Sequence, residues 1–149
     1  MSLHFYAYAR KGYEFIDDVA AALHLDDTDK AGRLTRCVFR ALRNQLSMED
    51  SFRLVAHLPM ALKAVYVDGW KINPKSEDEK ISSDIISEVV REDANSAWRD
   101  FSNHDEVKNV VLGVFKVLFR HVGELEMTNL IAVLPPLLRK ELLEDIKPV

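Results

Sequence analysis

An internal repeat constrains the fold of this chain more than any other feature. When residues 34–66 are shifted by 76 positions without gaps, eight of the 33 pairs are identical, against about two expected by chance. The identities include the Leu58–Pro59 pair, which recurs as Leu134–Pro135. We therefore predict an all-α fold of about eight helices, arranged as two homologous four-helix repeats that share one core. We also predict that residues 1–149 form a single domain, with repeat one at about 2–69, an exposed linker at about 70–80 and repeat two at about 81–147.

The apolar residues of the N-terminal region recur at three- and four-residue steps, which is the period of an α-helix. The positions are Phe5, Tyr8, Ala9, Gly12, Phe15, Ile16, Val19 and Leu23. A glycine inside a helix costs about 1 kcal/mol relative to alanine. Gly12 therefore indicates either a closely approaching neighbour or a helix break near Arg10. We predict one continuous helix and keep the break as the alternative.

Several residues mark the ends of the predicted helices. Asp27 or Thr28 is placed to cap a second helix, and Ser47 with Asp50 resembles a capping box. Proline disfavours helical geometry at the preceding residue and suits the first turn of a helix, so Leu58–Pro59 predicts a corner between two helices. The helix after this corner is expected to end near Asp68–Gly69. In the second half, either Asn103 with Glu106 or Ser102 with Asp105 caps a helix.

The predicted helix at about 105–122 is apolar on nearly all sides, which is typical of a helix buried on several sides. It carries Leu112 and Phe119 at the positions that correspond to Arg36 and Arg43 in the first half. We expect this helix either at the centre of the fold or in a homo-oligomer interface.

Composition bounds the class of protein. The net charge of −4 provides no overall field that would attract phosphate backbones or anionic membranes, so we expect no nucleic acid and no membrane partner. The longest apolar run, Val110–Phe119, is interrupted by Lys116 and is shorter than the roughly 18 to 20 residues of a membrane span. With Cys37 as the single cysteine and no signal-peptide core at the N-terminus, the sequence predicts a cytoplasmic location.

Four segments resemble a known bacterial family. These are Leu46–Glu49, Leu58–Trp70, Val114–Leu118 and Val133–Pro135, of which Tyr66–Trp70 is the most specific. Together they resemble the bacterial domain of unknown function 2267 over nearly the whole chain. The resemblance implies a small cytoplasmic helical module with two related halves. It brings no established reaction, cofactor or catalytic residue that could be assigned here.

The first candidate site is formed by Tyr66, Asp68 and Trp70. Two aromatic rings and a carboxylate beside a glycine could hold a small polar ligand. The simpler interpretation is a helix end that is stopped by Gly69, with Trp70 folded back on the core.

The second candidate is a basic stripe of Arg33, Arg36, Arg40 and Arg43. At 100° per residue these side chains span about 80° of one helix, so they could face an acidic protein or phosphates. The simpler interpretation is a solvated helix face that is balanced by nearby Asp and Glu side chains.

Other chemically active residues give weaker signals. His121 and Glu124 have the spacing of a helical metal-ligand pair, but a zinc site needs three or four converging ligands, so no metal is predicted. Cys37 lies beside an apolar stripe and is interpreted as a buried small hydrophobe. Phosphate-binding glycine loops and nucleophile elbows are absent from the sequence, so we assign no catalytic residue and no cofactor.

The sequence therefore favours a non-catalytic helical interaction or regulatory module that self-associates or binds a protein partner. The alternative hypothesis is a small-ligand sensor with a groove between the repeats near Tyr66 to Trp70.

Overall fold

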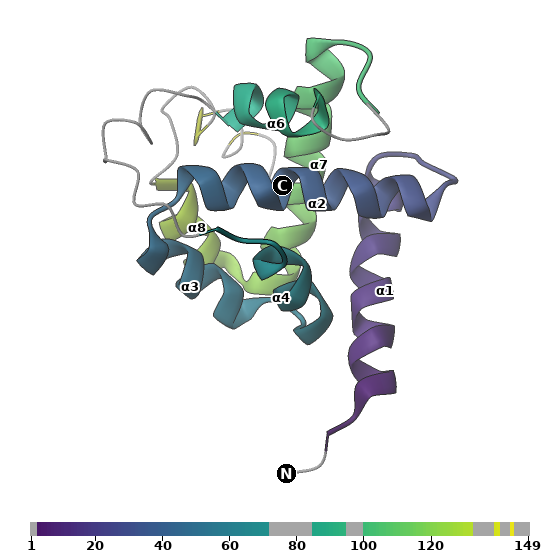
Figure 1. Ribbon diagram of the computed structural model, residues 1–149, viewed down its shortest axis with the longest axis vertical. Coiled ribbons are helices and arrows are strands. Elements are labelled where there is room, and N and C mark those ends of the chain that lie inside the picture. Colours follow the sequence, from purple (N-terminus) through teal and green to yellow (C-terminus); the bar gives the residue numbers. More distant parts are fainter. Residues whose placement is uncertain (1–2, 72–84, 95–99, 133–138, 141–143, 145–149) are drawn as a thin grey trace.

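The computed structural model describes residues 3–71, 85–94, 100–132, 139–140 and 144. Within these residues it contains seven α-helices and no strand, so the predicted all-helical class is confirmed (Figure 1). The helices are α1 (Phe5–Ala22), α2 (Thr28–Gln45), α3 (Met48–His57), α4 (Met60–Val67), α6 (Ile85–Ala94), α7 (His104–Val122) and α8 (Glu124–Ala132).

Polar side chains begin three of these helices as the sequence predicted. Asp27 accepts hydrogen bonds from the first amides of α2 at 3.0 and 3.2 Å, so it, rather than Thr28, is the cap. Ser47 accepts from an α3 amide at 3.1 Å, and Asn103 accepts from the Glu106 amide of α7 at 2.8 Å. Each bond satisfies a donor that the first turn of a helix leaves unpaired.

The predicted corner at Leu58–Pro59 is confirmed, because α3 ends at His57 and α4 begins at Met60. The Pro59 carbonyl accepts hydrogen bonds from the amides of Leu62 and Lys63 at 2.9 and 3.0 Å, which starts the new helix at once. At the other end of α4, Gly69 adopts a φ of +66°, a left-handed conformation that glycine adopts without steric cost.

Helix α1 runs unbroken through Gly12, so the prediction of one continuous helix is confirmed. The reason is the closely approaching neighbour: a Cβ atom added to Gly12 would lie 2.8 Å from the Cβ of Ala61 in α4. The predicted apolar stripe, however, is wrong for the N-terminal half of the helix. Phe5 and Ala9 are exposed, because burial on α1 begins only at Gly12 and continues at Phe15, Val19 and Ala20.

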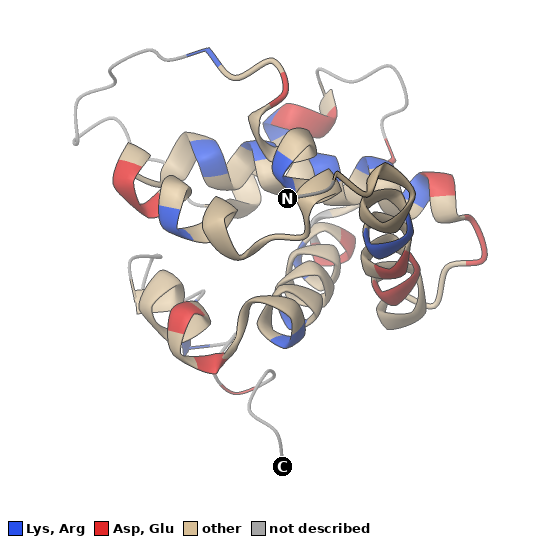
Figure 2. Ribbon diagram, turned by 90° about the horizontal axis from the view of Figure 1, so that it is seen from below, with Lys and Arg blue, Asp and Glu red and all other residues tan. Residues whose placement is uncertain are grey.

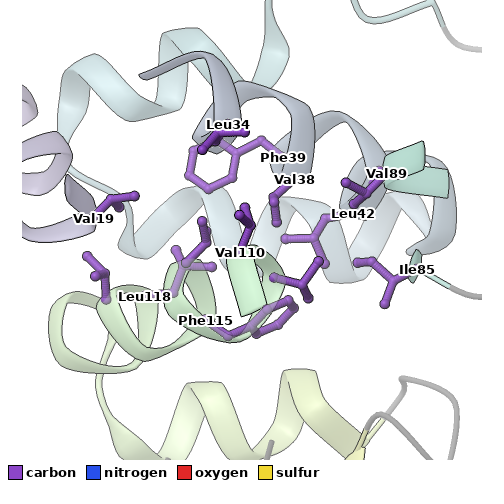
Figure 3. Close-up of a cluster of buried hydrophobic side chains, with 14 of the residues drawn as sticks. Val19, Leu34, Val38, Phe39, Leu42, Ile85, Val89, Val110, Phe115 and Leu118 are labelled. Atoms are coloured by element: carbon purple, nitrogen blue, oxygen red, sulfur yellow. The ribbon is translucent and has the colours of Figure 1, made fainter. Parts of the chain in front are cut away.

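Helix α7 lies at the centre of the fold, the first of the two places that the sequence allowed. It packs against α1, α2, α3, α6 and α8. Its buried residues meet those of α1, α2 and α6 in the main core, where Val110, Phe115 and Leu118 face Phe39 and Leu42 (Figure 3). The apolar faces of α7 are thus largely covered within the chain.

Some predicted features lie outside the described residues. They include most of the linker at about 70–80 and the second corner, Leu134–Pro135. Within the described part of the chain, no helix has both the length and the apolarity to cross a bilayer.

Candidate functional site

Tyr66 belongs to the last turn of α4 and is completely buried. Its ring packs against Phe39 with centroids 5.7 Å apart, and its hydroxyl shares a hydrogen bond of 2.8 Å with Ser51 Oγ. Burial raises the pKa of the Tyr66 phenol to about 12, although the Ser51 hydrogen bond and the nearby Arg43 charge lower it in part. The Tyr66 side chain therefore joins α4 to α2 and α3 inside the core.

Trp70 and Asp68 have different surroundings from Tyr66. Trp70 is half-buried, and its ring meets Tyr66 edge-on with centroids 5.8 Å apart and Phe52 with centroids 6.4 Å apart. Asp68 is exposed beside Gly69. The structure thus brings the two aromatic residues of this candidate together and places the third residue on the surface, at a helix end that packs on the core.

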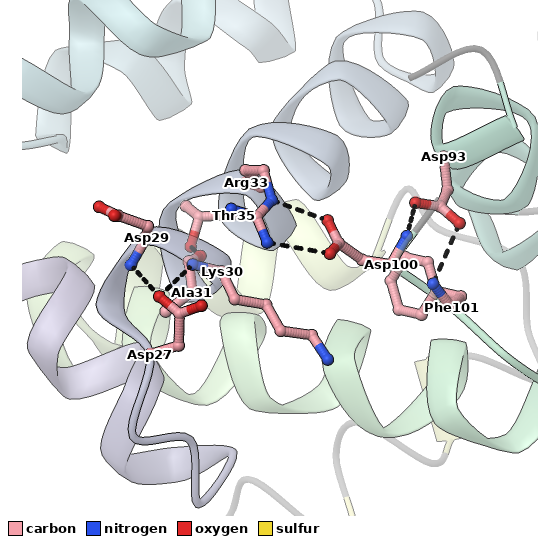
Figure 4. Close-up of polar contacts among 9 residues, drawn as sticks. All are labelled: Asp27, Asp29, Lys30, Ala31, Arg33, Thr35, Asp93, Asp100 and Phe101. Carbon is pink, nitrogen blue, oxygen red and sulfur yellow. Dashed lines mark hydrogen bonds and ion pairs between the residues drawn. The ribbon is translucent and has the colours of Figure 1, made fainter. Parts of the chain in front are cut away.

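Arg33, the first residue of the basic stripe, forms a bidentate ion pair with Asp100 (Figure 4). Both N–O distances are 3.1 Å, and this hydrogen-bonded pairing raises the pKa of Arg33. Asp100 is itself held in place, because the carboxylate of Asp93 accepts the amides of Asp100 and Phe101 at 2.8 and 3.2 Å. A charge-assisted pair with two parallel hydrogen bonds fixes the relative geometry of its partners and is stronger than a neutral hydrogen bond. The pair therefore links α2 to the loop that precedes α7.

Arg43 caps the end of α4. One of its Nη atoms donates to the carbonyls of Tyr66 and Asp68 at 3.0 and 2.7 Å, where the helix leaves carbonyls without partners of their own. Burial lowers the pKa of Arg43. The Nε atoms of Arg43 and Arg40 are buried without a hydrogen-bond partner in the described part of the chain, and Arg36 is the exposed member of the stripe.

The basic stripe is therefore not a uniform solvated surface. Acidic residues of α6 lie against α2, and Asn44 donates to Glu88 and Glu92 at 3.4 and 3.1 Å. The charge of the stripe is thus partly balanced by acidic side chains within the fold. Asp100 could not be predicted as the Arg33 partner, because the two residues are 67 positions apart.

Cys37 and His121 also make contacts within the fold. The Cys37 thiol donates to the Val89 carbonyl at 3.4 Å, and burial raises its pKa to about 12, which disfavours the nucleophilic thiolate. His121 Nε2 lies 2.9 Å from the Asp18 carboxylate and links α7 to α1. Among the residues that the structure describes, no group of three or more His, Cys, Asp or Glu side chains could hold a metal ion.

An open groove of about 630 Å³ lies between α1, α2 and α4, and we call it the α1 groove. Small and apolar side chains form much of it, while Asp17, Asp29, Arg33 and Arg36 contribute charge of both signs. Its lining comprises Ala9, Gly12, Tyr13, Ile16, Asp17, Thr28, Asp29, Gly32, Arg33, Thr35, Arg36, Ala61, Leu62 and Val65.

Sequence reasoning did not identify this groove. Gly32 was the available signal, because a glycine leaves space that a larger side chain would fill, and a Cβ there meets no atom within 4 Å. Three large aromatic residues of α1 are exposed, and Tyr13 among them lines the groove: Phe5 at 70%, Tyr6 at 95% and Tyr13 at 71% of their surface. Exposed aromatic residues around a concave apolar surface are typical of interaction sites.

The fold and these contacts define a small all-helical bundle, braced by polar links between helices, with an open groove on one side. The family model described as "Uncharacterized conserved protein (DUF2267)" matches residues 12–141. The chain belongs to this family, as the sequence resemblance indicated. A comparison with curated proteins found no match.

Proposed function

We propose that the chain is a non-catalytic helical interaction module and that the α1 groove is its interaction surface. The observation that carries this proposal is the apolar groove together with the exposed aromatic residues Tyr6 and Tyr13 on the adjoining helix. An amphipathic helix lying in such a groove is a common mode of protein recognition, and tyrosine supplies a large contact area at a low cost in conformational entropy.

The polar groups of the molecule support the same proposal. Tyr66, Arg33 and Arg43 each join two segments of the fold, and the raised pKa of Cys37 disfavours nucleophilic chemistry. These groups therefore have structural roles, whereas Tyr13 contributes its exposed ring to the groove lining. With Cys37 as the only cysteine, the chain needs no oxidising compartment, and we place the module in the cytoplasm.

Photo-crosslinking in cells tests this function. A benzophenone amino acid would replace Tyr13 in the groove, and a matched chain would carry it at Lys116, an exposed position on α7. We expect a discrete adduct from position 13 that is lost when Gly32→Glu is added, because a Cβ at Gly32 meets no atom within 4 Å and the new side chain has room to project without distorting the fold. An adduct yield at position 13 no higher than at position 116 would contradict the proposal.

A small-ligand sensor is the second candidate. The observation that favours it is the volume of the α1 groove, which falls within the range of about 300–1,000 Å³ typical of ligand pockets. The sequence pointed instead to Tyr66–Trp70, where half-buried Trp70 offers an aromatic edge. A thermal-shift screen against metabolites, repeated with Tyr13→Ala and Trp70→Ala, distinguishes the two places. A ligand whose shift is lost only with Tyr13→Ala would bind in the groove.

We also infer that the chain consists of two repeats. The bounds of α2 and α3, shifted by 76 positions, become 104–121 and 124–133, and the helices found there are α7 (His104–Val122) and α8 (Glu124–Ala132). The capping residues Asp27 and Asn103 are separated by the same 76 positions. If the repeat extends to the second corner, NMR chemical shifts of residues 136–143 will be helical. Extended or random-coil shifts there would contradict this inference.

A further inference from the structure

The N-terminal half of α1 lacks the support that the rest of the helix receives. From Phe5 to Lys11 no residue is fully buried, and His4 precedes the helix without a side-chain capping bond. In Figure 1, α1 lies along one edge of the molecule, with its N-terminal end pointing away from the core. Short helical segments without packing or caps are marginal in water, so an additional contact surface would stabilise these turns.

The charges of α1 are divided along its length. The basic residues Arg10 and Lys11 come first, and the acidic residues Glu14, Asp17 and Asp18 follow, as the blue and then red bands of α1 show in Figure 2. Two copies of such a helix placed antiparallel would set the basic half of each copy against the acidic half of the other. The pattern is thus complementary to itself under a two-fold axis.

Arg10 and Asp17 set the register of this pairing. They are seven residues apart, so they lie within about 20° of the same line along the helix, at the edge of the face that carries Tyr6 and Tyr13. Neither side chain makes an ion pair within the part of the chain that the structure describes. A two-fold axis between Tyr13 and Glu14 would place Arg10 of each copy opposite Asp17 of the other.

From this geometry we propose that the occupant of the interaction surface is a second copy of the chain, docked with the two α1 helices antiparallel. This inference rests on the proposed function and names its partner. Tyr13 lies beside the two-fold axis, and Tyr6 of each copy comes level with Ala21 of the other copy, near the turn that leads into α2. Thr28 and Asp29 line the α1 groove at that end, so the exposed aromatic face of one copy covers the groove of the other.

Sedimentation equilibrium of four purified chains tests the pairing: wild type, Arg10→Glu, Asp17→Arg and the double variant. All the changed side chains are exposed, so the fold is kept, which circular dichroism verifies. We expect wild type to approach twice its 17.1 kDa mass and each single variant to dissociate on the order of tenfold more readily, because two ion pairs become two repulsive pairs. The double variant restores dimerisation, and so does mixing the two single variants, since the mixed dimer has two opposite-charge pairs.

Three outcomes overturn the pairing: a wild-type chain that remains a monomer at millimolar concentration, single variants that dimerise as well as wild type, or a double variant that does not recover. The photo-crosslinking experiment distinguishes failure of the α1 pairing from failure of the proposed interaction function. An adduct at position 13 with the mass of two chains supports the second copy as occupant. An adduct of any other mass, from a chain that is monomeric in sedimentation, overturns the second copy and keeps the interaction function.

Discussion

The close contact between α1 and α4 is tested most sharply by a matched pair of glycine substitutions. A Cβ at Gly12 would lie 2.8 Å from the Cβ of Ala61, whereas a Cβ at Gly32 meets no atom within 4 Å. Both glycines lie inside helices, so replacement by alanine favours folding by about 0.5–1 kcal/mol at either position through the backbone. Only Gly12→Ala adds a clash.

The free-energy cost of that clash depends on whether the Cβ of Ala61 can move away. Its Cβ has no rotamer that moves it away, so α4 itself must shift, and overpacking of this kind costs about 1–3 kcal/mol. We therefore expect Gly32→Ala to raise the free energy of unfolding by about 0.5–1 kcal/mol and Gly12→Ala to lower it by up to about 2 kcal/mol. For a chain of this length, 1 kcal/mol corresponds to about 2–4 °C in Tm.

Urea denaturation followed by far-UV circular dichroism measures both changes, at a protein concentration where wild type is monomeric. The midpoints should move in opposite directions at an unchanged m-value. Adding Ala61→Gly to Gly12→Ala removes the clashing atom, so a double-mutant cycle should show a favourable coupling of about 1–3 kcal/mol between the two changes. If Gly12→Ala stabilised the protein as much as Gly32→Ala does, α1 and α4 would not be packed as described.

Three further predictions concern the contacts that brace the fold. A double-mutant cycle of Arg33→Met and Asp100→Asn should give a coupling of about 1 kcal/mol, because the ion pair is bidentate. The coupling should decrease with added salt, because both side chains are partly exposed. The folded-state pKa of Tyr66, about 12, lies above the ordinary value of 10.0. The stability that the neutral phenol provides is therefore complete below pH 10 and is lost as pH rises through about 12. In alkaline urea titrations, wild type should lose about 2–3 kcal/mol of its free energy of unfolding over this range, and Tyr66→Phe should not show this loss. Trp70→Ala should lower the free energy of unfolding by about 2 kcal/mol in the same urea assay, roughly half the cost of truncating a fully buried aromatic residue.

Each of these predictions has a contradicting result. Additive effects of the two ion-pair substitutions would mean that Arg33 and Asp100 do not act together. Equal alkaline losses in wild type and Tyr66→Phe would assign the loss to other groups, among which Cys37 also has a raised pKa. An unchanged midpoint for Trp70→Ala would indicate a surface role for Trp70 and would favour the ligand-site interpretation of Tyr66–Trp70.

Local signals in the sequence predicted local structure well. Asp27, Ser47 and Asn103 begin helices because a short polar side chain can reach the unpaired amides of the first turn, which depends on nearby residues alone. Pro59 marks its corner because its ring restricts the residue before it. Gly12 correctly indicated a close neighbour, although the sequence could not identify Ala61 as that neighbour.

Contacts between distant segments were the part that the sequence could not supply. The pairing of Arg33 with Asp100 depends on how the loop before α7 crosses α2, and spacing along the chain carries no information about that. The apolar period of α1 predicted burial from Phe5 onward, but periodicity reports which face of a helix is apolar and not how far the neighbouring helices extend along it. The exposed end of α1 and the groove beside it therefore emerge only from the fold.

Hydrogen exchange of the α1 amides at two protein concentrations tests the central claim, that the chain associates through α1 and its groove, most directly. We predict that amides from Tyr8 to Lys11, the first of α1 with helical hydrogen-bond acceptors, exchange quickly in dilute protein and become protected as concentration rises, because these turns gain their packing only from a second copy. Amides in the middle of α7, which is buried within the chain, should keep the same protection at both concentrations. Protection of α1 that does not change with concentration would contradict the claim.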